Sequence, residues 1–242
     1  GDSTVVLLHG FLEDLSMWDE LTQDLMSEHK VISVDLLGHG LSENIMEIHT
    51  MPLMAESVAA VLEKENIQNS KLIGHSMGGY VALAFAKRHK LSVDKIVLLN
   101  STALDDRPQK KEDRLRAIKV LKSGKKQFIN EAIPKLFAEK NRRKLSKEIE
   151  AARIIAQNTS NNGISAALLG MRERENCLEW IKKTSIPIVY ISGEEDGIIP
   201  ILTCQEQAEH SQSSIHVLKG CGHMAHTESR EKCLDVIKNE LK

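Results

Sequence analysis

The stretch Lys71-Leu72-Ile73-Gly74-His75-Ser76-Met77-Gly78-Gly79-Tyr80 determines the fold that this sequence predicts. It joins a short apolar strand to an apolar helical segment through a G-x-S-x-G turn centred on Ser76. Glycines two residues before and after the serine permit a tight turn, because Cβ atoms there would crowd the neighbouring backbone. The hydroxyl then projects above the sheet at a helix N-terminus, whose dipole favours a developing anion. We therefore predict a nucleophilic Ser76; the alternative is a glycine-rich turn in which Ser76 only caps the helix.

Short apolar runs elsewhere in the chain predict further strands. They lack the alternation of a half-exposed strand, and most are followed by a helical pattern. Strands buried on both faces by crossover helices have this character, so we predict an α/β fold with a doubly wound, mostly parallel sheet. The expected strands are residues 5–8, 31–34, 71–73, 95–99, 187–191 and 215–218, and the expected helices are 18–27, 54–65, 77–88, 201–210 and 228–241.

A helical insertion interrupts this pattern between the fourth and fifth expected strands. Residues 107–184 show helical spacing and no convincing strand, with Gly124 expected to end a helix and Pro134 expected to kink one. We predict a core domain formed by residues 1–106 and 185–242, and a helical lid formed by residues 107–184. The lid should sit over the carboxyl ends of the strands, where open α/β sheets bind ligands.

Composition excludes several classes of protein. The 242 residues are 41% apolar and 27% charged with a formal net charge of −2, unlike collagen-like, disordered or nucleic-acid-coating chains. No apolar run approaches the roughly 18 residues that span a bilayer, and acidic residues begin at Asp2. We expect a cytoplasmic protein with no membrane span, no signal peptide and no nucleic-acid partner; its oligomeric state stays open. Four widely spaced cysteines without a C-x-x-C pair are expected to be idle buried thiols.

The charge is unevenly distributed along the chain. Residues 107–150 contain 15 Lys or Arg against 6 Asp or Glu, whereas the rest of the chain is acidic. One interpretation is a solvated helical face, with Lys110 and Arg114 pointing outward while Leu115 and Leu121 pack inward. The other is a basic lid that draws anionic substrates, such as acyl-CoA esters, toward the site.

A nucleophilic serine needs a base and a carboxylate that orients the base. His223, just past the sixth expected strand and preceded by Gly220 and Gly222, is the expected base, and His226 is the alternative. Asp196, just past the fifth expected strand, is the expected carboxylate. Its competitors are two neighbouring acidic residues, Glu194 and Glu195. The serine, the aspartate and the histidine follow one another in the chain order typical of such sites.

Backbone N–H groups are the expected donors to the oxyanion that acyl transfer develops. We assign this role to Met77, which follows the serine, and to Phe11, because Gly10 lets the backbone turn over the sheet. The expected chemistry needs no cofactor. His223 and His226 have the spacing of a metal pair, but no third ligand is placed to complete it, so we expect no metal.

Together these segments resemble the α/β-hydrolase superfamily, in its lidded serine hydrolase and carboxylesterase branch. The resemblance covers nearly the whole chain. It rests on His9-Gly10-Phe11 with Trp18, on residues 35–42, on the turn at Ser76 with Gly79, on residues 193–200, and on Gly222-His223 followed by Glu228. It implies a catalytic triad of Ser76, His223 and Asp196. In the family, the segment resembling residues 35–42 shapes the loop beneath the site, so His39 is expected to be structural.

Two departures from the family pattern affect what the resemblance implies. Members usually carry an antiparallel hairpin before the first strand, whereas only residues 1–4 precede it here, so we expect a lost edge hairpin or a truncated chain. The menaquinone-pathway lyase of this superfamily typically has an arginine, which holds an acidic substrate, where Tyr80 stands here. This difference disfavours the lyase.

The resemblance and the site residues favour a serine hydrolase that cleaves a small or medium carboxylic ester or thioester through an acyl-enzyme on Ser76. Two alternatives stay open. The same triad could serve a C–C bond hydrolase or a lyase, in which Ser76 and His223 abstract a proton, or the fold could be a non-catalytic receptor for a small molecule. Dehalogenases and epoxide hydrolases are excluded because both need a carboxylate nucleophile at this position.

Overall fold

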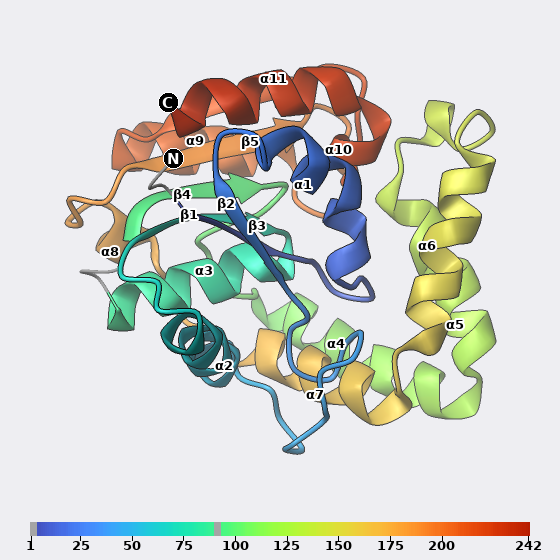
Figure 1. Cartoon of the computed structure of the whole chain (residues 1–242). Coiled ribbons are helices and arrows are strands. Elements are labelled where there is room, and N and C mark those ends of the chain that lie inside the picture. The colour runs from blue at the N-terminus through green and yellow to red at the C-terminus, as the bar shows by residue number, and fades with distance from the viewer. Residues whose placement is uncertain (1–3, 90–92) are drawn as a thin grey trace.

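One parallel sheet organises the structure, a computed structural model that describes residues 4–89 and 93–242. Six strands lie in the order β2-β1-β3-β4-β5-β6, and every neighbouring pair is parallel (Figure 1). The strands are β1 (Thr4–Leu8), β2 (Lys30–Val34), β3 (Ser70–His75), β4 (Val93–Leu99), β5 (Ile188–Gly193) and β6 (Ser214–Leu218). The predicted α/β fold with a parallel sheet is confirmed.

Helices cover both faces of the sheet, which explains the unbroken apolar runs in the sequence. In β1, Val5 and Leu7 face one core, which includes residues of α1 (Asp19–Leu25) and α11 (Arg230–Leu241). Val6 and Leu8 face the opposite core, against α2 (Met51–Lys64), α3 (Met77–Arg88) and α9 (Ile201–Ser211). Alternate residues of a strand are therefore all buried, so no polar face is left to produce alternation.

Some helix boundaries differ from the expected ones for local reasons. The chain expected to be helical from residue 18 begins as a 3-10 turn, η1 (Leu15–Trp18), and α1 ends at Leu25. Helix α2 begins three residues earlier than expected, because the Thr50 hydroxyl accepts a hydrogen bond from the Leu53 N–H at 3.2 Å. The last expected helix is two helices, α10 (Ala225–Glu228) and α11, separated at Ser229.

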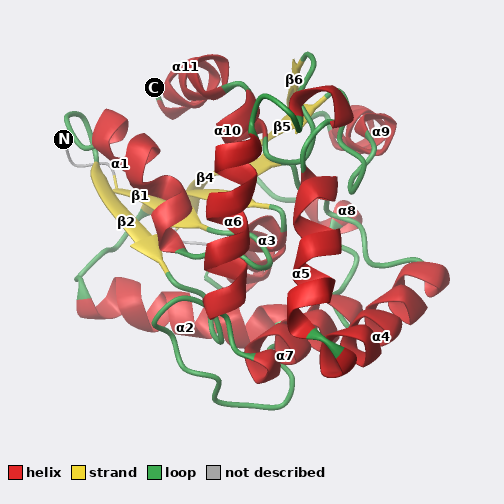
Figure 2. Ribbon diagram, turned by 90° about the vertical axis from the view of Figure 1, so that its right-hand side faces the viewer, coloured by secondary structure: helices red, strands yellow, loops and turns green. Residues whose placement is uncertain are grey.

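The insertion between β4 and β5 is helical in the described structure and stands beyond the carboxyl ends of the strands (Figures 1 and 2). As expected, Gly124 ends a helix, and Pro134 lies in the turn that follows the next one. The elements are α4 (Pro108–Ser123), α5 (Lys125–Ala132), η3 (Ile133–Leu136), η4 (Glu139–Asn141), α6 (Ser146–Asn158) and α7 (Asn161–Arg172), and the short α8 (Leu178–Ile181) leads back to β5.

Close backbone contact anchors the insertion to the loop between β2 and α2. On α7, a Cβ atom at Gly163 would overlap the Gly38 carbonyl, and one at Gly170 would overlap the His49 carbonyl. The His49 N–H also donates to the Ala166 carbonyl at 3.0 Å. Helix α7 therefore lies against this loop at a distance that only glycine permits.

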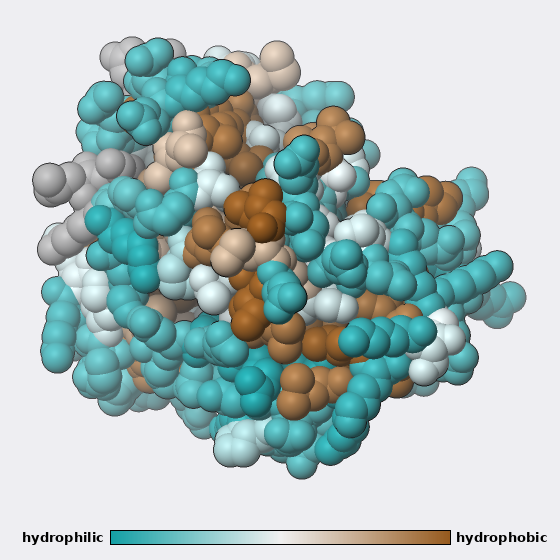
Figure 3. All heavy atoms as spheres, turned by 90° about the horizontal axis from the view of Figure 1, so that it is seen from below, coloured by the Kyte–Doolittle hydropathy of each residue, from teal (hydrophilic) through white to brown (hydrophobic). Residues whose placement is uncertain are grey.

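The outer surface seen from below is mainly hydrophilic, with hydrophobic side chains gathered near its centre (Figure 3). Exposed apolar residues of the described chain include Leu41, Ile45 and Met46, which all belong to the loop between β2 and α2. None of the described helices is long and apolar enough to cross a membrane.

The variant Gly170→Ala should destabilise the protein, because its methyl group would meet a backbone carbonyl that cannot rotate away. We expect a loss of roughly 1–3 kcal/mol in the free energy of unfolding, measured by urea denaturation, despite the better helix propensity of alanine. Gly124→Ala is the matched control in the same insertion, since its backbone is extended and its Cβ would meet nothing closer than 3.9 Å. Equal stabilities of the two variants would contradict the close packing of α7.

Candidate active site

Ser76 occupies a sharp turn between β3 and α3. Its backbone has φ +49° and ψ −112°, a strained conformation for a residue with a side chain. The turn is compact because Gly74 approaches the backbone of Gly78 and Gly79, and Gly78 approaches the Leu8 carbonyl, too closely for a Cβ atom. The Ser76 N–H donates to the Leu99 carbonyl at 3.0 Å. The strain is therefore held in place by two neighbouring strands.

A chain of hydrogen bonds joins Ser76, His223 and Asp196. The Ser76 Oγ lies 2.9 Å from Nε2 of His223, whose Nδ1 lies 2.8 Å from Oδ2 of Asp196. His223 and Asp196 are 2% and 6% exposed. With a neutral imidazole, Nδ1–H donates to the carboxylate, which leaves Nε2 to accept the serine proton. The structure thus brings together the three side chains that the sequence analysis selected, from loops after three different strands.

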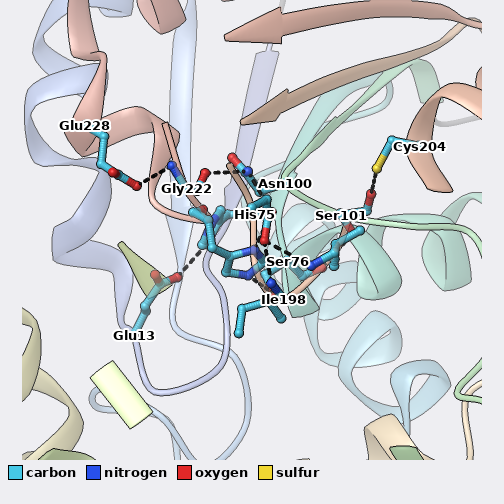
Figure 4. Close-up of polar contacts among 12 residues, drawn as sticks. Glu13, His75, Ser76, Asn100, Ser101, Ile198, Cys204, Gly222 and Glu228 are labelled. Carbon is cyan, nitrogen blue, oxygen red and sulfur yellow. Dashed lines mark hydrogen bonds and ion pairs between the residues drawn. The ribbon is translucent and has the colours of Figure 1, made fainter. Parts of the chain in front are cut away.

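The Asp196 carboxylate is held in its charged form. Burial alone would raise the pKa of Asp196, but the His223 ring and several N–H donors lower this pKa below its usual range. The N–H groups of Ile198 and Ile199 donate to Oδ1 at 2.8 and 2.9 Å, and Asn100 Nδ2 donates to Oδ2 at 2.9 Å (Figure 4). Asp196 can therefore orient the imidazole without taking a proton from it.

Asn100 is a site residue that the sequence analysis missed. It follows β4 with a positive φ of 45°, and its Nδ2 also donates to the Gly222 carbonyl at 3.1 Å. It therefore links the Asp196 loop to the His223 loop. Its place directly after the strand next to β3 was the only signal in the sequence, and one polar residue at a strand end is too common a feature to select it.

The competing acidic residues lie elsewhere. Glu194 is exposed and accepts a hydrogen bond from the Gly220 N–H, while Glu195 forms an ion pair with Lys140. Neither contacts His223.

The competing base, His226, does not contact Ser76. Its Nδ1 has no hydrogen-bond partner in the described part of the chain, and its ring packs against that of His75 with centroids 5.0 Å apart. Burial and the neighbouring His75 charge lower the pKa of His226 to about 3. His226 therefore stays neutral beside the site. Among the described residues, no three side chains of His, Cys, Asp or Glu are grouped to hold a metal ion.

The two backbone N–H groups expected to bind the oxyanion are available to a substrate. In the described residues, neither the Phe11 nor the Met77 N–H donates to another protein group. Met77 is the first residue of α3, where N–H groups have no partner inside the helix. Phe11 lies beside the same cavity as Ser76. His39, expected to be structural, is buried between the rings of His9 and Phe11, and burial lowers its pKa to about 3.

The insertion is bonded to the loop that carries His223. The Glu228 carboxylate accepts a hydrogen bond from the Gly222 N–H at 2.8 Å (Figure 4) and another from the Ala138 N–H at 3.0 Å. The His223 N–H in turn donates to the Leu136 carbonyl at 2.7 Å. The position of the imidazole thus depends on the segment around η3.

A cavity of about 600 Å³ opens in front of Ser76 and His223. Both apolar and charged side chains line it, and among the charged ones Asp106 is bound by Arg114 and Arg174. The apolar walls come from the insertion and from the loop after Asp196, and include Ala117, Phe128, Ala132, Leu136, Leu168, Ile198 and Ile199. One of the two interpretations of the basic stretch placed Arg114 on a solvated face; its side chain is instead 11% exposed and is bound to Asp106. The cavity can hold a small or medium organic molecule.

Comparisons with known proteins agree with this fold. A family model described as "alpha/beta hydrolase fold" matches residues 3–229. Esterase YbfF of Escherichia coli K12 is 25% identical, with 99% of this chain and 93% of the relative covered. The AB hydrolase superfamily protein YisY of Bacillus subtilis is 27% identical, with coverage of 96% and 89%. A solved thermophilic esterase from Thermogutta terrifontis, with malate bound, superposes with a TM-score of 0.93 at 32% identity, covering 98% and 89% of the two chains.

Replacing Asn100 should weaken the junction of the two site loops. Asn100→Gly removes both hydrogen bonds but tolerates the positive φ, and we expect it to lower the free energy of unfolding by about 2–3 kcal/mol. Asn100→Ala should cost more, because alanine also strains the backbone. Urea denaturation measures both, with the exposed Asn158→Ala as a control expected within about 0.5 kcal/mol of wild type. A stability of Asn100→Gly equal to that of the control would show that the junction is unimportant.

Proposed function

The chain belongs to the α/β-hydrolase-fold family, and on that basis we propose that it is a serine hydrolase of small or medium carboxylic esters or thioesters. The observation that carries the proposal is the hydrogen-bond chain from Asp196 through His223 to Ser76 at the mouth of an apolar cavity. The esterases among the relatives support the same substrate class. Acyl transfer at Ser76 needs no group beyond these side chains, two backbone N–H groups and water.

The proposed reaction has two halves. The Ser76 Oγ bonds to the substrate carbonyl carbon while its proton moves to Nε2 of His223, and the Asp196 carboxylate stabilises the resulting imidazolium. The N–H groups of Phe11 and Met77 bind the oxyanion. Collapse of this intermediate breaks the bond to the alcohol or thiol, which receives the proton from His223. Water, deprotonated by the same nitrogen, then releases the acid and restores Ser76.

The apolar part of the cavity lining favours neutral substrates over charged ones. Asp106 binds both Arg114 and Arg174, so one carboxylate offsets part of the positive charge of the two guanidinium groups. The other charged residues of the lining are Arg107, Lys110, Lys135, Asp105, Asp113 and Glu13, the last of which is paired with His75. Because apolar side chains make up most of the rest of the lining, we propose neutral esters as substrates rather than acyl-CoA esters.

Labelling with a fluorophosphonate tests the nucleophile. We expect mass spectrometry to find the adduct on the peptide that contains Ser76. The variant Ser76→Ala should lose the labelling and about a thousandfold or more of the p-nitrophenyl ester hydrolysis. Ser57→Ala, in α2, is the control and should behave as wild type. Absence of labelling in folded wild-type protein would favour a non-catalytic receptor, and labelling without ester turnover would favour a C–C bond hydrolase or a lyase.

Two histidine variants test the base. His223→Ala should lower kcat by roughly three to five orders of magnitude, because no other group can accept the Ser76 proton. His226→Ala should stay within about tenfold of wild type, since its ring only packs beside the site. Steady-state kinetics with one p-nitrophenyl ester measures both. The reverse order of effects would assign the base to His226.

Salt dependence tests the substrate charge. We expect kcat/KM for a neutral ester and for an anionic thioester of equal acyl length to change by less than about threefold between roughly 20 mM and 500 mM salt, because the proposed recognition rests on apolar contacts, which carry no charge for salt to screen. A steep loss of kcat/KM for the anionic substrate alone would instead support electrostatic attraction by the basic insertion.

A further inference from the structure

His75 lies between two groups that can only accept hydrogen bonds. It is the last residue of β3, directly before Ser76, and its side chain is 1% exposed. Its Nδ1 lies 2.8 Å from Oε2 of Glu13, and its Nε2 lies 2.9 Å from the carbonyl oxygen of His223 (Figure 4). A carboxylate and a carbonyl both lack a proton to give, so each contact needs an N–H on the ring. His75 is therefore a buried imidazolium.

The surrounding charges stabilise this protonation state. Burial alone would lower the pKa of His75, but the Glu13 carboxylate and the two hydrogen bonds raise it above its ordinary value. Burial would raise the pKa of Glu13, but His75 lowers it to about 2. The other titratable groups near the pair include His226, which is neutral, and His223, whose ring centroid lies 5.1 Å from that of His75. His9 also acts on Glu13, and Asp196 acts on His75.

The same carboxylate also binds the loop that carries the first oxyanion donor. Oε2 of Glu13 accepts a hydrogen bond from the Gly10 N–H at 2.6 Å. On the other side of Gly10, Nδ1 of His9 lies 2.7 Å from the Gly10 carbonyl oxygen. That carbonyl belongs to the peptide that supplies the Phe11 N–H, and the two groups of a trans peptide point in opposite directions. The direction of the Phe11 N–H is thus set from both sides.

One continuous set of bonds therefore runs from the oxyanion loop, through Glu13 and His75, to the backbone of the proposed base. We infer that Glu13 and His75 are positioning residues, which hold the Phe11 N–H and the His223 imidazole at their working positions around Ser76. This inference rests on the proposed function. Neither residue touches the reacting atoms: they act through the Gly10–Phe11 backbone and the His223 carbonyl.

Stability alone is a poor explanation for this pair. A buried ion pair gains little over well-packed apolar side chains, because both charges lose their hydration. The pair instead orients two segments, the Gly10–Phe11 backbone and the His223 backbone, whose placement decides the reaction. A displacement of about 1 Å in such a site can cost roughly a hundredfold in rate.

Three variants test the inference. Glu13→Leu and His75→Gln break the chain of bonds, and we expect kcat to fall roughly ten- to a hundredfold while KM stays within about threefold. Glu13→Gln keeps the shape and removes only the charge, so its loss should be smaller. Affinity for a trifluoromethyl ketone, whose adduct with Ser76 carries an oxyanion, should fall in parallel with kcat. The rate of fluorophosphonate labelling should fall as well.

Glu240→Gln provides the matched control. The Glu240 carboxylate, near the C-terminus of α11, lies 2.8 Å from Nε2 of His216 and forms an ion pair with Lys95 close to the amino end of β4. Its removal should leave kcat, KM and inhibitor affinity unchanged. Circular dichroism and thermal unfolding check that each variant is folded; if Glu13→Leu is not, the Glu13→Gln variant decides.

The outcomes separate the inference from the proposed function. If wild-type protein neither labels nor hydrolyses esters, the proposed function is wrong. If wild type is active and the folded Glu13 and His75 variants keep kcat and inhibitor affinity within twofold, the pair does not position the site. A lowered melting temperature with unchanged kcat would assign the pair a purely structural role and would equally overturn the inference.

Discussion

The contact between the first turn of α3 and the ends of β1 and β3 is the constraint on which the site depends. Gly78 lies against the Leu8 carbonyl so closely that no side chain fits, and Gly74 lies equally close to the backbone of the same turn. This contact leaves Ser76 with a positive φ and directs its hydroxyl away from the sheet. It also aligns the start of α3 with the loop after β1, so the N–H groups of Phe11 and Met77 belong to neighbouring backbone segments.

The remaining groups reach Ser76 because parallel strands bring their carboxyl ends to one edge of the sheet. Asp196 follows β5 and His223 lies in the loop after β6, yet β5 and β6 are not neighbours of β3. Asn100, after the intervening β4, spans this distance by binding both Asp196 and the Gly222 carbonyl. Glu228 then fastens the same loop to the insertion. A site assembled from separate loops thus gains rigidity from bonds between the loops.

These bonds bury charged carboxylates, and in each case nearby donors or cations stabilise the buried charge. Asp196 is surrounded by N–H donors, and Glu13 faces a protonated His75. In the cavity wall, Asp106 binds two arginines. In each case a carboxylate keeps its charge because donors replace the lost water. Apolar side chains form much of the remaining cavity wall, which suits the acyl or alcohol part of an ester.

The sequence by itself determined the parallel sheet, the helical insertion and the choice of Ser76, Asp196 and His223 as candidates. These features are local: apolar runs without alternation indicate two covered faces, and the glycines around Ser76 are typical of a tight turn from strand to helix. Only the tertiary structure decided that Asn100 joins two loops and that Glu13 binds His75, 62 positions along the chain. Such pairs leave no local pattern, because each partner alone is an ordinary polar residue. The two members of each pair become partners only when the strand order places them in one buried space, where polar atoms need hydrogen-bond partners.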